Sequence, residues 1–165
     1  MERTSFAAMS CSLARTLEMV GDWWSPLIVR DLFLGICRFD DLAEDLGISR
    51  NLLTRRLKLL VQNGIASKKL YQSRPARYEY ELTAAGLDLV PALLALTAWG
   101  DRWTMLEDGT PMLFKHKSCG HRFQPKITCS ECGAAIRSDA VAVLPGPGGK
   151  MGPGTRVVAR KLKAV

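Results

Sequence analysis

The 165-residue sequence predicts an α+β fold that is mainly helical, followed by a small module and a tail. Apolar residues recur every three or four positions in the first 62 residues, a short stretch near residue 80 alternates polar and apolar side chains, and two cysteine motifs follow residue 115. The expected parts are a first domain over residues 11–108, a module over residues 112–144, and a disordered, basic Gly/Pro tail over residues 145–165.

The first two helices are predicted by apolar spacing and by their end residues. The first covers residues 12–20 and ends at Gly21, and Asp22 is positioned to cap the second, over residues 23–34. This second segment is apolar on nearly all sides, which is typical of a buried helix.

The next two helices have the spacing of a helix-turn-helix. One covers residues 39–46 and ends at Gly47; the other covers residues 50–62, with Ser49 as its N-cap, and ends at Asn63-Gly64. Because a tight turn containing glycine joins them, they match the helix-turn-helix pattern.

A β-hairpin and a long helix complete the predicted domain. The strands cover residues 65–71 and 77–82, and the loop between them carries Arg74 and Pro75. Thr83 is placed to cap a helix that runs to about residue 107. A hairpin after a helix-turn-helix is a wing, so the predicted domain is a winged helix-turn-helix.

The helix over residues 50–62 has one apolar and one polar face. Leu53, Leu57 and Leu60 lie together on a helical wheel, and the polar residues point away from them. An exposed helical face of this width fits the DNA major groove, and a basic wing can contact the backbone or the minor groove. The candidate DNA-binding residues are Ser49, Arg50, Asn51, Thr54, Arg55, Lys58, Lys68, Lys69, Arg74 and Arg77.

The distribution of charge supports a polyanionic partner. The chain carries a net charge of +7, and residues 49–78 hold eight basic residues and no acidic residue. The alternative is an ordinary amphipathic helix with a solvated basic face. Arg56 lies beside the apolar face, where an internal ion pair or a phosphate contact is expected.

Several short runs over about residues 11–105 carry a family resemblance in their order and spacing. They are Cys11-Ser-Leu-Ala-Arg-Thr-Leu, Gly21-Asp-Trp-Trp, Leu27-Ile-Val-Arg-Asp-Leu, Arg38-Phe-Asp-Asp-Leu, Gly47-Ile-Ser, Leu53-Thr-Arg-Arg-Leu, Asn63-Gly64-Ile65, Tyr71, Pro75, Arg77-Tyr-Glu-Tyr-Glu-Leu-Thr, Gly86 and Trp99-Gly100. Together they resemble the HxlR family of bacterial winged-helix regulators. The resemblance implies a MarR-related homodimer in which the first and last helices form the interface and each protomer reads half of a palindromic operator.

Surplus apolar residues agree with a dimer. Those of the first helix and of the end of the long helix exceed what one small core needs, and such stripes mark interfaces. They are Leu13, Leu17, Val20, Leu94, Trp99 and Trp103. The alternative is that the two stripes contact each other within one chain.

Two motifs in the C-terminal module have the spacing of metal ligands. His116 precedes Cys119-Gly as Cys129 precedes Cys132-Gly. Four such ligands predict a closed, tetrahedral, structural Zn²⁺ site in a zinc-ribbon-like module. His121 is the rival fourth ligand, and the alternative is a metal-free loop with reduced thiols.

Cysteine use and the remaining motifs limit the other functions. The chain has five cysteines, and an odd number argues against a disulfide framework. The resemblance implies that Cys11 is a possible sensor of thiol-reactive stress, and Arg15 lies one turn from it. No catalytic motif is found, so an enzyme is not expected. No apolar stretch is long enough to span a membrane, and no secretory signal is found, so a cytoplasmic protein is expected.

These observations predict a homodimeric, sequence-specific transcriptional regulator that represses from a double-stranded DNA operator. One alternative is a zinc-ribbon module that binds proteins, and another is a thiol-redox sensor that uses Cys11. The sequence identifies neither the operator nor an effector.

Overall fold

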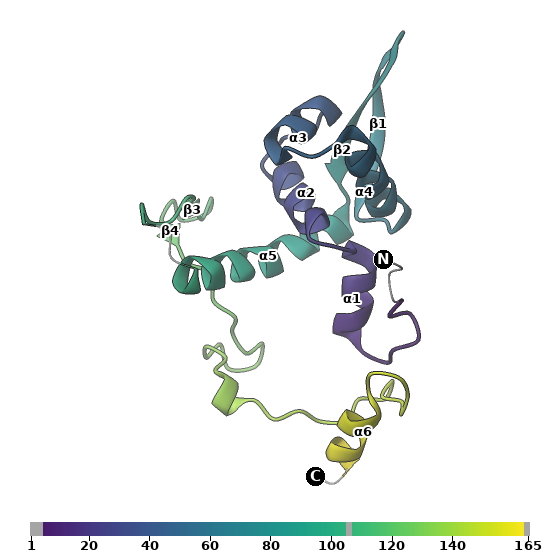
Figure 1. Cartoon of the computed structure of the whole chain (residues 1–165). Helices are drawn as coiled ribbons and strands as arrows, with labels where there is room; N and C mark the ends of the chain where they lie inside the picture. Colours follow the sequence, from purple (N-terminus) through teal and green to yellow (C-terminus); the bar gives the residue numbers. More distant parts are fainter. Residues whose placement is uncertain (1–4, 105–106, 164–165) are drawn as a thin grey trace. The chain divides into compact units, whose positions relative to one another are not determined.

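The computed structural model describes residues 5–104 and 107–163 (Figure 1). The chain divides into two compact units. One contains the described residues up to Gly86 together with those from Ala142 onward, and the other covers Leu87–Val141. Within the described residues, no helix combines the length and the apolar character needed to cross a membrane.

Four helices open the first unit, as the spacing predicted. They are α1 (Ser12–Val20), α2 (Trp24–Phe33), α3 (Phe39–Leu46) and α4 (Arg50–Gln62). The α2 helix contacts both α3 and α4, and α1 contacts α4. The Asn63 side chain donates a hydrogen bond of 2.7 Å to the Met19 carbonyl, which ties the end of α4 to α1.

The predicted helix ends are confirmed by their hydrogen bonds. The Asp22 carboxylate accepts from the Trp24 and Ser25 amides at 2.9 and 3.1 Å and so caps α2. The Ser49 hydroxyl accepts from the Leu52 amide at 3.3 Å and caps α4. Gly47 ends α3 with a φ of +61°, a left-handed conformation that favours glycine.

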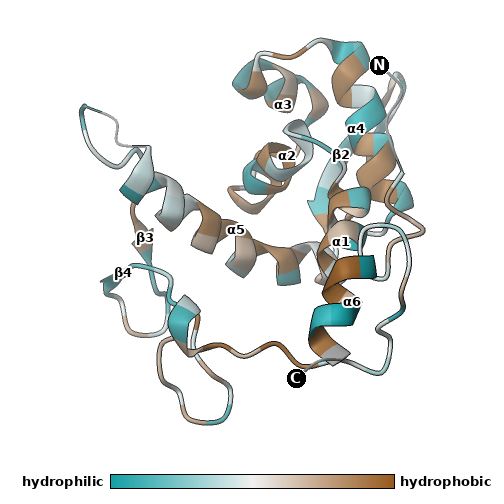
Figure 2. Cartoon of the chain, turned by 60° about the horizontal axis from the view of Figure 1, so that its bottom comes forward, coloured by the Kyte–Doolittle hydropathy of each residue, from teal (hydrophilic) through white to brown (hydrophobic). Residues whose placement is uncertain are grey.

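The core of the first unit lies where α2, α3 and α4 meet. Its most deeply buried apolar side chains, each less than 2% exposed, are Ile28, Val29, Leu42, Leu53, Leu57 and Leu60. Figure 2 shows hydrophobic residues along α2 and α4. The prediction that the second helix is buried on nearly all sides is wrong, because Trp23, Phe33 and Leu34 are 91%, 45% and 50% exposed. The neighbouring elements of one chain cover only one side of α2.

The wing is a two-stranded antiparallel hairpin of β1 (Ala66–Ser73) and β2 (Ala76–Leu82). Figure 1 shows its tip projecting away from α3 and α4. The strands extend further than predicted, because pairing resumes after an irregularity between Leu70 and Gln72 and leaves only Arg74 and Pro75 at the turn. At its base, the Tyr80 amide donates to the Cys37 carbonyl at 2.8 Å, which joins β2 to the loop before α3.

Gly86 lies against the backbone at the start of the wing. A Cβ atom at this position would stand 2.2 Å from the Ile65 carbonyl oxygen. The Thr83 hydroxyl holds the same region together, because it donates to the Gly64 carbonyl at 2.5 Å and accepts from the Gly86 amide at 3.2 Å. The close approach therefore explains why only glycine fits here.

The long helix α5 covers Ala84–Trp103 and contains Pro91. It was predicted to reach about residue 107, but it ends at Trp103, and residues 105–106 lie outside the described residues. Thr83 caps it as predicted.

The second unit continues with short hairpins. Strands β3 (Phe114–Lys115) and β4 (Arg122–Phe123) pair antiparallel, and Thr128 forms an isolated antiparallel bridge with Ala135. A single 3₁₀ turn, η1 (Ser138–Ala140), follows. No residue between 107 and 154 is buried, so these hairpins have no core of their own.

The last segment differs from the prediction of a disordered tail. The structure places a helix, α6 (Arg156–Lys163), after the glycine- and proline-rich stretch. The eight residues of α6 contain neither glycine nor proline, and the apolar pair Val157-Val158 lies between basic Arg156 and the basic run that begins at Arg160. The composition of the preceding stretch thus does not extend to the end of the chain.

Candidate nucleic-acid interface

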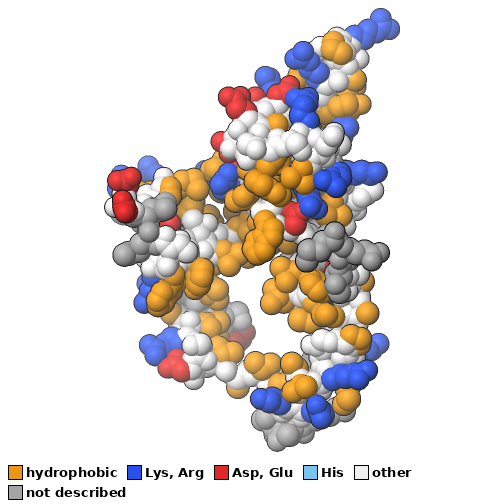
Figure 3. All heavy atoms as spheres, in the orientation of Figure 1, with side chains coloured by type: hydrophobic (Ala, Val, Ile, Leu, Met, Phe, Trp, Pro, Cys, Tyr) orange, Lys and Arg blue, Asp and Glu red, His pale blue; other side chains and the backbone are white. Residues whose placement is uncertain are grey.

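One face of α4 is anchored in the core and the other is exposed. Leu53, Leu57 and Leu60 are at most 1% exposed. All of the candidate DNA-binding residues are exposed, both on α4 and on the wing. They are Ser49, Arg50, Asn51, Thr54, Arg55, Lys58, Lys68, Lys69, Arg74 and Arg77. Figure 3 shows lysine and arginine side chains on the surface of the wing.

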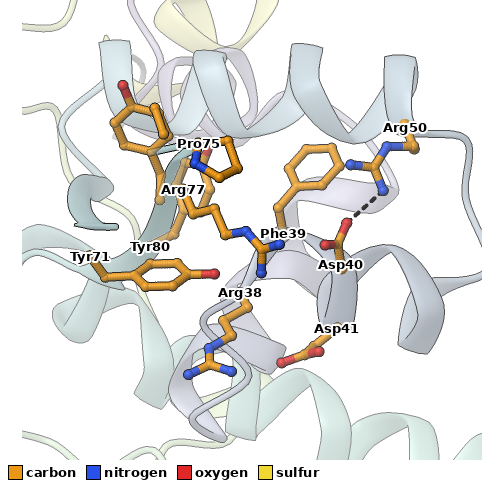
Figure 4. Close-up of a pocket in the computed structure, with 11 residues that line it drawn as sticks. Arg38, Phe39, Asp40, Asp41, Arg50, Tyr71, Pro75, Arg77 and Tyr80 are labelled. Carbon is orange, nitrogen blue, oxygen red and sulfur yellow. Dashed lines mark hydrogen bonds and ion pairs between the residues drawn. The ribbon is translucent and has the colours of Figure 1, made fainter. Parts of the chain in front are cut away.

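The exposed side chains of α4 fall into two groups. Arg50 is held by its neighbours, because its guanidinium lies 2.5 Å from the Asp40 carboxylate and 4.7 Å from the centre of the Phe39 ring (Figure 4). This contact links the beginning of α4 to the beginning of α3. In the described parts of the chain, Arg55 and Lys58 form no ion pair.

The basic side chains of the wing also fall into two groups, those held by neighbouring residues and those without an ion pair in the described part of the chain. The Lys68 ammonium lies 3.7 Å from the centre of the Tyr78 ring, and Lys69 lies 3.5 and 3.7 Å from the carboxylates of Glu79 and Glu81. These contacts brace the two strands against each other. Arg74 at the tip and Arg77 beside it form no ion pair within the described residues, so their charges face solvent.

A cleft of about 470 Å³ lies between the beginning of α3 and the wing. The guanidinium carbon of Arg38 lies 5.3 Å from the centre of the Tyr71 ring, and Arg77 lies nearby (Figure 4). The sequence did not predict this contact, because Arg38 precedes α3 and Tyr71 lies on β1, so the two residues are distant in sequence and meet only in the folded domain. The one indication in the sequence was Arg38 itself, a basic residue placed just before the acidic Asp40-Asp41 at the start of α3.

An ion pair fixes α4 to the beginning of α2. The Arg56 guanidinium pairs with the Asp22 carboxylate, and the two side chains are 25% and 15% exposed. This confirms the expected internal pairing of Arg56. Since Asp22 also caps α2, one carboxylate sets both the start of α2 and the position of α4.

A second ion pair lies on α2. Asp31 is fully buried, its carboxylate lies 2.6 Å from the Arg30 guanidinium, and Arg30 also reaches Asp45 of α3 at 3.3 Å. Burial raises the pKa of Asp31, and the adjacent Arg30 opposes that shift. The cluster orients α3 relative to α2 and is therefore part of the scaffold.

The cysteines lie in different settings. Cys11 is partly exposed at the N-cap of α1, and its thiol forms no capping hydrogen bond. His116 Nδ1 lies 3.3 Å from Cys119 Sγ, and hydrogen bonds from the Cys132 and Glu131 backbones lower the pKa of Cys129. The predicted metal ligands thus form two pairs, and among the described residues no group of three or more His, Cys, Asp or Glu side chains is arranged to hold a metal ion.

Comparison with known proteins agrees with this architecture. An uncharacterised HTH-type transcriptional regulator of Mycobacterium tuberculosis is 42% identical over 84% of this chain and 88% of its own length. The crystal structure of PA1607, a candidate transcription factor, matches with a TM-score of 0.74 and 32% identity, over 85% of this chain and 98% of its own. The oxidised form of the redox regulator HypR matches with a TM-score of 0.51 and 29% identity, over 56% of this chain and 96% of its own.

A family model described as HxlR-like helix-turn-helix matches residues 19–108. This range covers α2 to α4, the wing and α5, which together form the winged helix-turn-helix. The matched range is more than half of the chain, and the relative from Mycobacterium tuberculosis is similar over a longer stretch of 139 residues. The chain belongs to the HxlR-like helix-turn-helix family.

Proposed function

We propose that the chain is a homodimeric transcriptional repressor that inserts α4 into the major groove of a specific operator. The observation that carries this proposal is the exposed polar face of a helix whose opposite face is anchored in the core. A helix fixed in this way can present side chains to base edges at a defined position. A dimer that occupies its operator obstructs transcription, and repression is therefore the expected outcome.

Base reading is assigned to the side chains of α4 that no neighbour holds. Arg55 and Lys58 suit guanine, which offers two acceptors in the major groove, and Asn51 suits adenine, which offers a donor and an acceptor. Ser49 lies at the helix N-terminus, where backbone amides favour a phosphate. Arg50 is paired with Asp40, so its assigned role is to set the angle between α3 and α4 and to contact the DNA backbone.

The wing supplies contacts that do not depend on sequence. Arg74 projects charge at its tip, where a phosphate or the minor groove can be reached, and Arg77 adds charge in the cleft between the wing and α3. Lys68 and Lys69 are held against Tyr78 and the acidic residues of β2. Their assigned role is to contribute positive electrostatic potential along the strand.

The homodimer is supported by apolar side chains that the described residues leave exposed. On α1, Leu13 and Leu17 are 67% and 47% exposed; on α5, Leu96 and Trp99 are 63% and 59% exposed. Exposed apolar surface of this size on two helices is typical of an interface. A second copy of this chain is the proposed partner, since two recognition helices related by a two-fold axis match a palindromic operator.

The test is binding of the purified protein to the DNA upstream of its own gene and to a scrambled fragment, in rising salt. The variant Arg55→Ala is expected to lose about 1–3 kcal/mol, or roughly tenfold to hundredfold, on the cognate fragment. Arg137→Ala is the matched control, because it removes the same charge from an exposed residue of the second unit.

Three outcomes are distinct. Cognate preference that Arg55→Ala abolishes and Arg137→Ala preserves supports the proposal. Equal, steeply salt-dependent binding to both fragments contradicts sequence-specific reading and leaves only phosphate contact. No binding to either fragment overturns the proposal and favours a protein-binding role for the module.

Thiol control of DNA binding is the second candidate. Its supporting observations are the partly exposed Cys11 at the start of α1 and the similarity to the redox regulator HypR. Cys11 stands at the start of α1, which is proposed to lie in the dimer interface. Oxidation of its thiol would therefore change the spacing of the two recognition helices. Cys11→Ser is expected to keep its affinity for DNA under a thiol oxidant while the natural protein loses it; equal loss in both contradicts a switch at Cys11.

A further inference from the structure

The second unit contains an internal repeat with a period of 13 residues. Residues 114–123 and 127–136 align without a gap, and three residues separate them. In this alignment His116 corresponds to Cys129, Cys119 to Cys132 and Gly120 to Gly133. Apolar residues occupy both ends of each copy, so the two segments share one pattern.

The backbone of the two copies folds in the same way. In the first, the His116 amide donates to the His121 carbonyl at 2.9 Å, and the Gly120 amide donates to the His116 carbonyl at 2.8 Å. In the second, the equivalent bonds run from Cys129 to Ala134 and from Gly133 to Cys129, both at 2.9 Å.

The strand pairing and the glycines repeat as well. Lys115 pairs with Arg122, and its equivalent Thr128 pairs with Ala135. Gly120 and Gly133 have φ values of +73° and +70°, a conformation that side-chain-bearing residues rarely adopt. The two copies are therefore equivalent hairpins, and each turn presents two metal-ligating side chains.

Within the first hairpin the two side chains already lie at ligand spacing. His116 Nδ1 and Cys119 Sγ are 3.3 Å apart. A tetrahedral zinc ion with ordinary bond lengths separates a nitrogen and a sulfur ligand by about 3.6 Å. The repeat also distinguishes the two histidines, because His116 occupies the position of Cys129, whereas His121 occupies that of Ala134.

The hairpins have little buried apolar surface to stabilise them. No residue from 107 to 154 is buried, and Phe123 and Ile127 are 37% and 63% exposed. Segments of this length do not fold on apolar burial alone and commonly depend on a metal or a disulfide. Thiolates with one imidazole form a set that selects zinc over hard cations.

We propose that the two equivalent hairpins close on one structural zinc ion held by His116, Cys119, Cys129 and Cys132. Each hairpin supplies two ligands, so the ion joins the turns and fixes the second hairpin to the first. Four protein ligands leave no open coordination position, and the site is structural rather than catalytic. The cysteine thiols lose their protons when the ion binds.

The test is the metal content of the full-length protein purified without added metal and then dialysed against excess zinc. One tightly held zinc per chain is expected for the natural protein and for His121→Ala. Cys129→Ser and His116→Ala are expected to lose that zinc. Cobalt substitution supplies an independent reading, since tetrahedral sulfur coordination gives intense visible absorption.

The variants are compared only where the helical circular dichroism shows that the winged helix-turn-helix remains folded. If Cys129→Ser reduces helical content, the natural protein is tested alone by cobalt titration, which reports ligand type and stoichiometry. Absence of stoichiometric zinc in the natural protein overturns the proposal. Loss of zinc in His121→Ala with retention in His116→Ala overturns the ligand assignment.

Discussion

The winged helix-turn-helix and the C-terminal hairpins are stabilised in opposite ways. Leu42, Leu53 and Leu57 are at most 1% exposed, whereas nothing between residues 107 and 154 is buried. The first region draws its stability from burial, and its polar face is left available for DNA. The second has regular turns and conspicuous ligand pairs but no interior, so its stability has to come from another source.

The largest expected difference between the two regions follows removal of metal. A strong chelator is expected to abolish protection of backbone amides in residues 114–136 and to leave α2 and α4 unchanged. The reason is that the hairpins have no buried residues to hold them once the proposed zinc ion is removed. Hydrogen exchange read by mass spectrometry checks this. Equal protection before and after chelation would show that the hairpins do not depend on metal.

Truncation of an apolar side chain sharpens the comparison from the other direction. Leu57→Ala is expected to lower the free energy of unfolding of the first region by about 2–5 kcal/mol, because it empties a site that is 1% exposed. Ile127→Ala, at 63% exposure, is expected to change stability by less than about 0.5 kcal/mol. Urea titration followed by circular dichroism measures both. Similar losses for the two variants would contradict the contrast in burial.

Substitution of two glycines, one crowded and one in open space, is expected to give a smaller difference in stability. Gly86→Ala is expected to destabilise the first region by roughly 1–3 kcal/mol, since its Cβ would stand 2.2 Å from the Ile65 carbonyl oxygen. Gly146→Ala is the control, because no atom lies within 4 Å of a Cβ there. Thermal melts of the two variants report the difference. An unchanged melting temperature for Gly86→Ala would mean that the backbone yields without cost.

The smallest expected effect concerns the helix caps. Ser49→Ala removes the side-chain bond to the Leu52 amide and is expected to cost about 1 kcal/mol. Cys11→Ala is the matched comparison, because Cys11 caps α1 without a side-chain hydrogen bond and its loss is expected to be close to neutral. Denaturant midpoints at a fixed pH separate the two. Equal shifts would indicate that the Ser49 cap contributes nothing.

Local spacing predicted most of the winged helix-turn-helix. The leucines of α4, the caps at Asp22 and Ser49, and the internal role of Arg56 were all available from residue order, because helical periodicity and capping act within a few residues. The partial exposure of α2 was not predicted. Burial depends on which elements surround a helix, and that is not encoded in its own composition.

The candidate sites were predictable to different degrees. The basic face of α4 follows from its helical wheel, whereas the cleft with Arg38 and Tyr71 joins a helix start to a strand that is distant in sequence. The spacing of the proposed zinc ligands was visible in the sequence, but the equivalence of the two hairpins could be recognised only from their hydrogen bonds. The helix α6 was not predicted, because the disorder expected from the glycine- and proline-rich stretch was extended to residues 156–163, which contain neither residue type.

The central claim is that two copies of α4 read one operator, and a footprint tests it most directly. The DNA upstream of the chain's own gene is cleaved by hydroxyl radicals with and without the purified protein. Two protected half-sites, with inverted sequence and centres about 10 base pairs apart or a multiple of that spacing, are predicted. The Arg55→Ala variant should erase both. Uniform weak protection, or none at concentrations where the protein is folded and dimeric, would contradict the account.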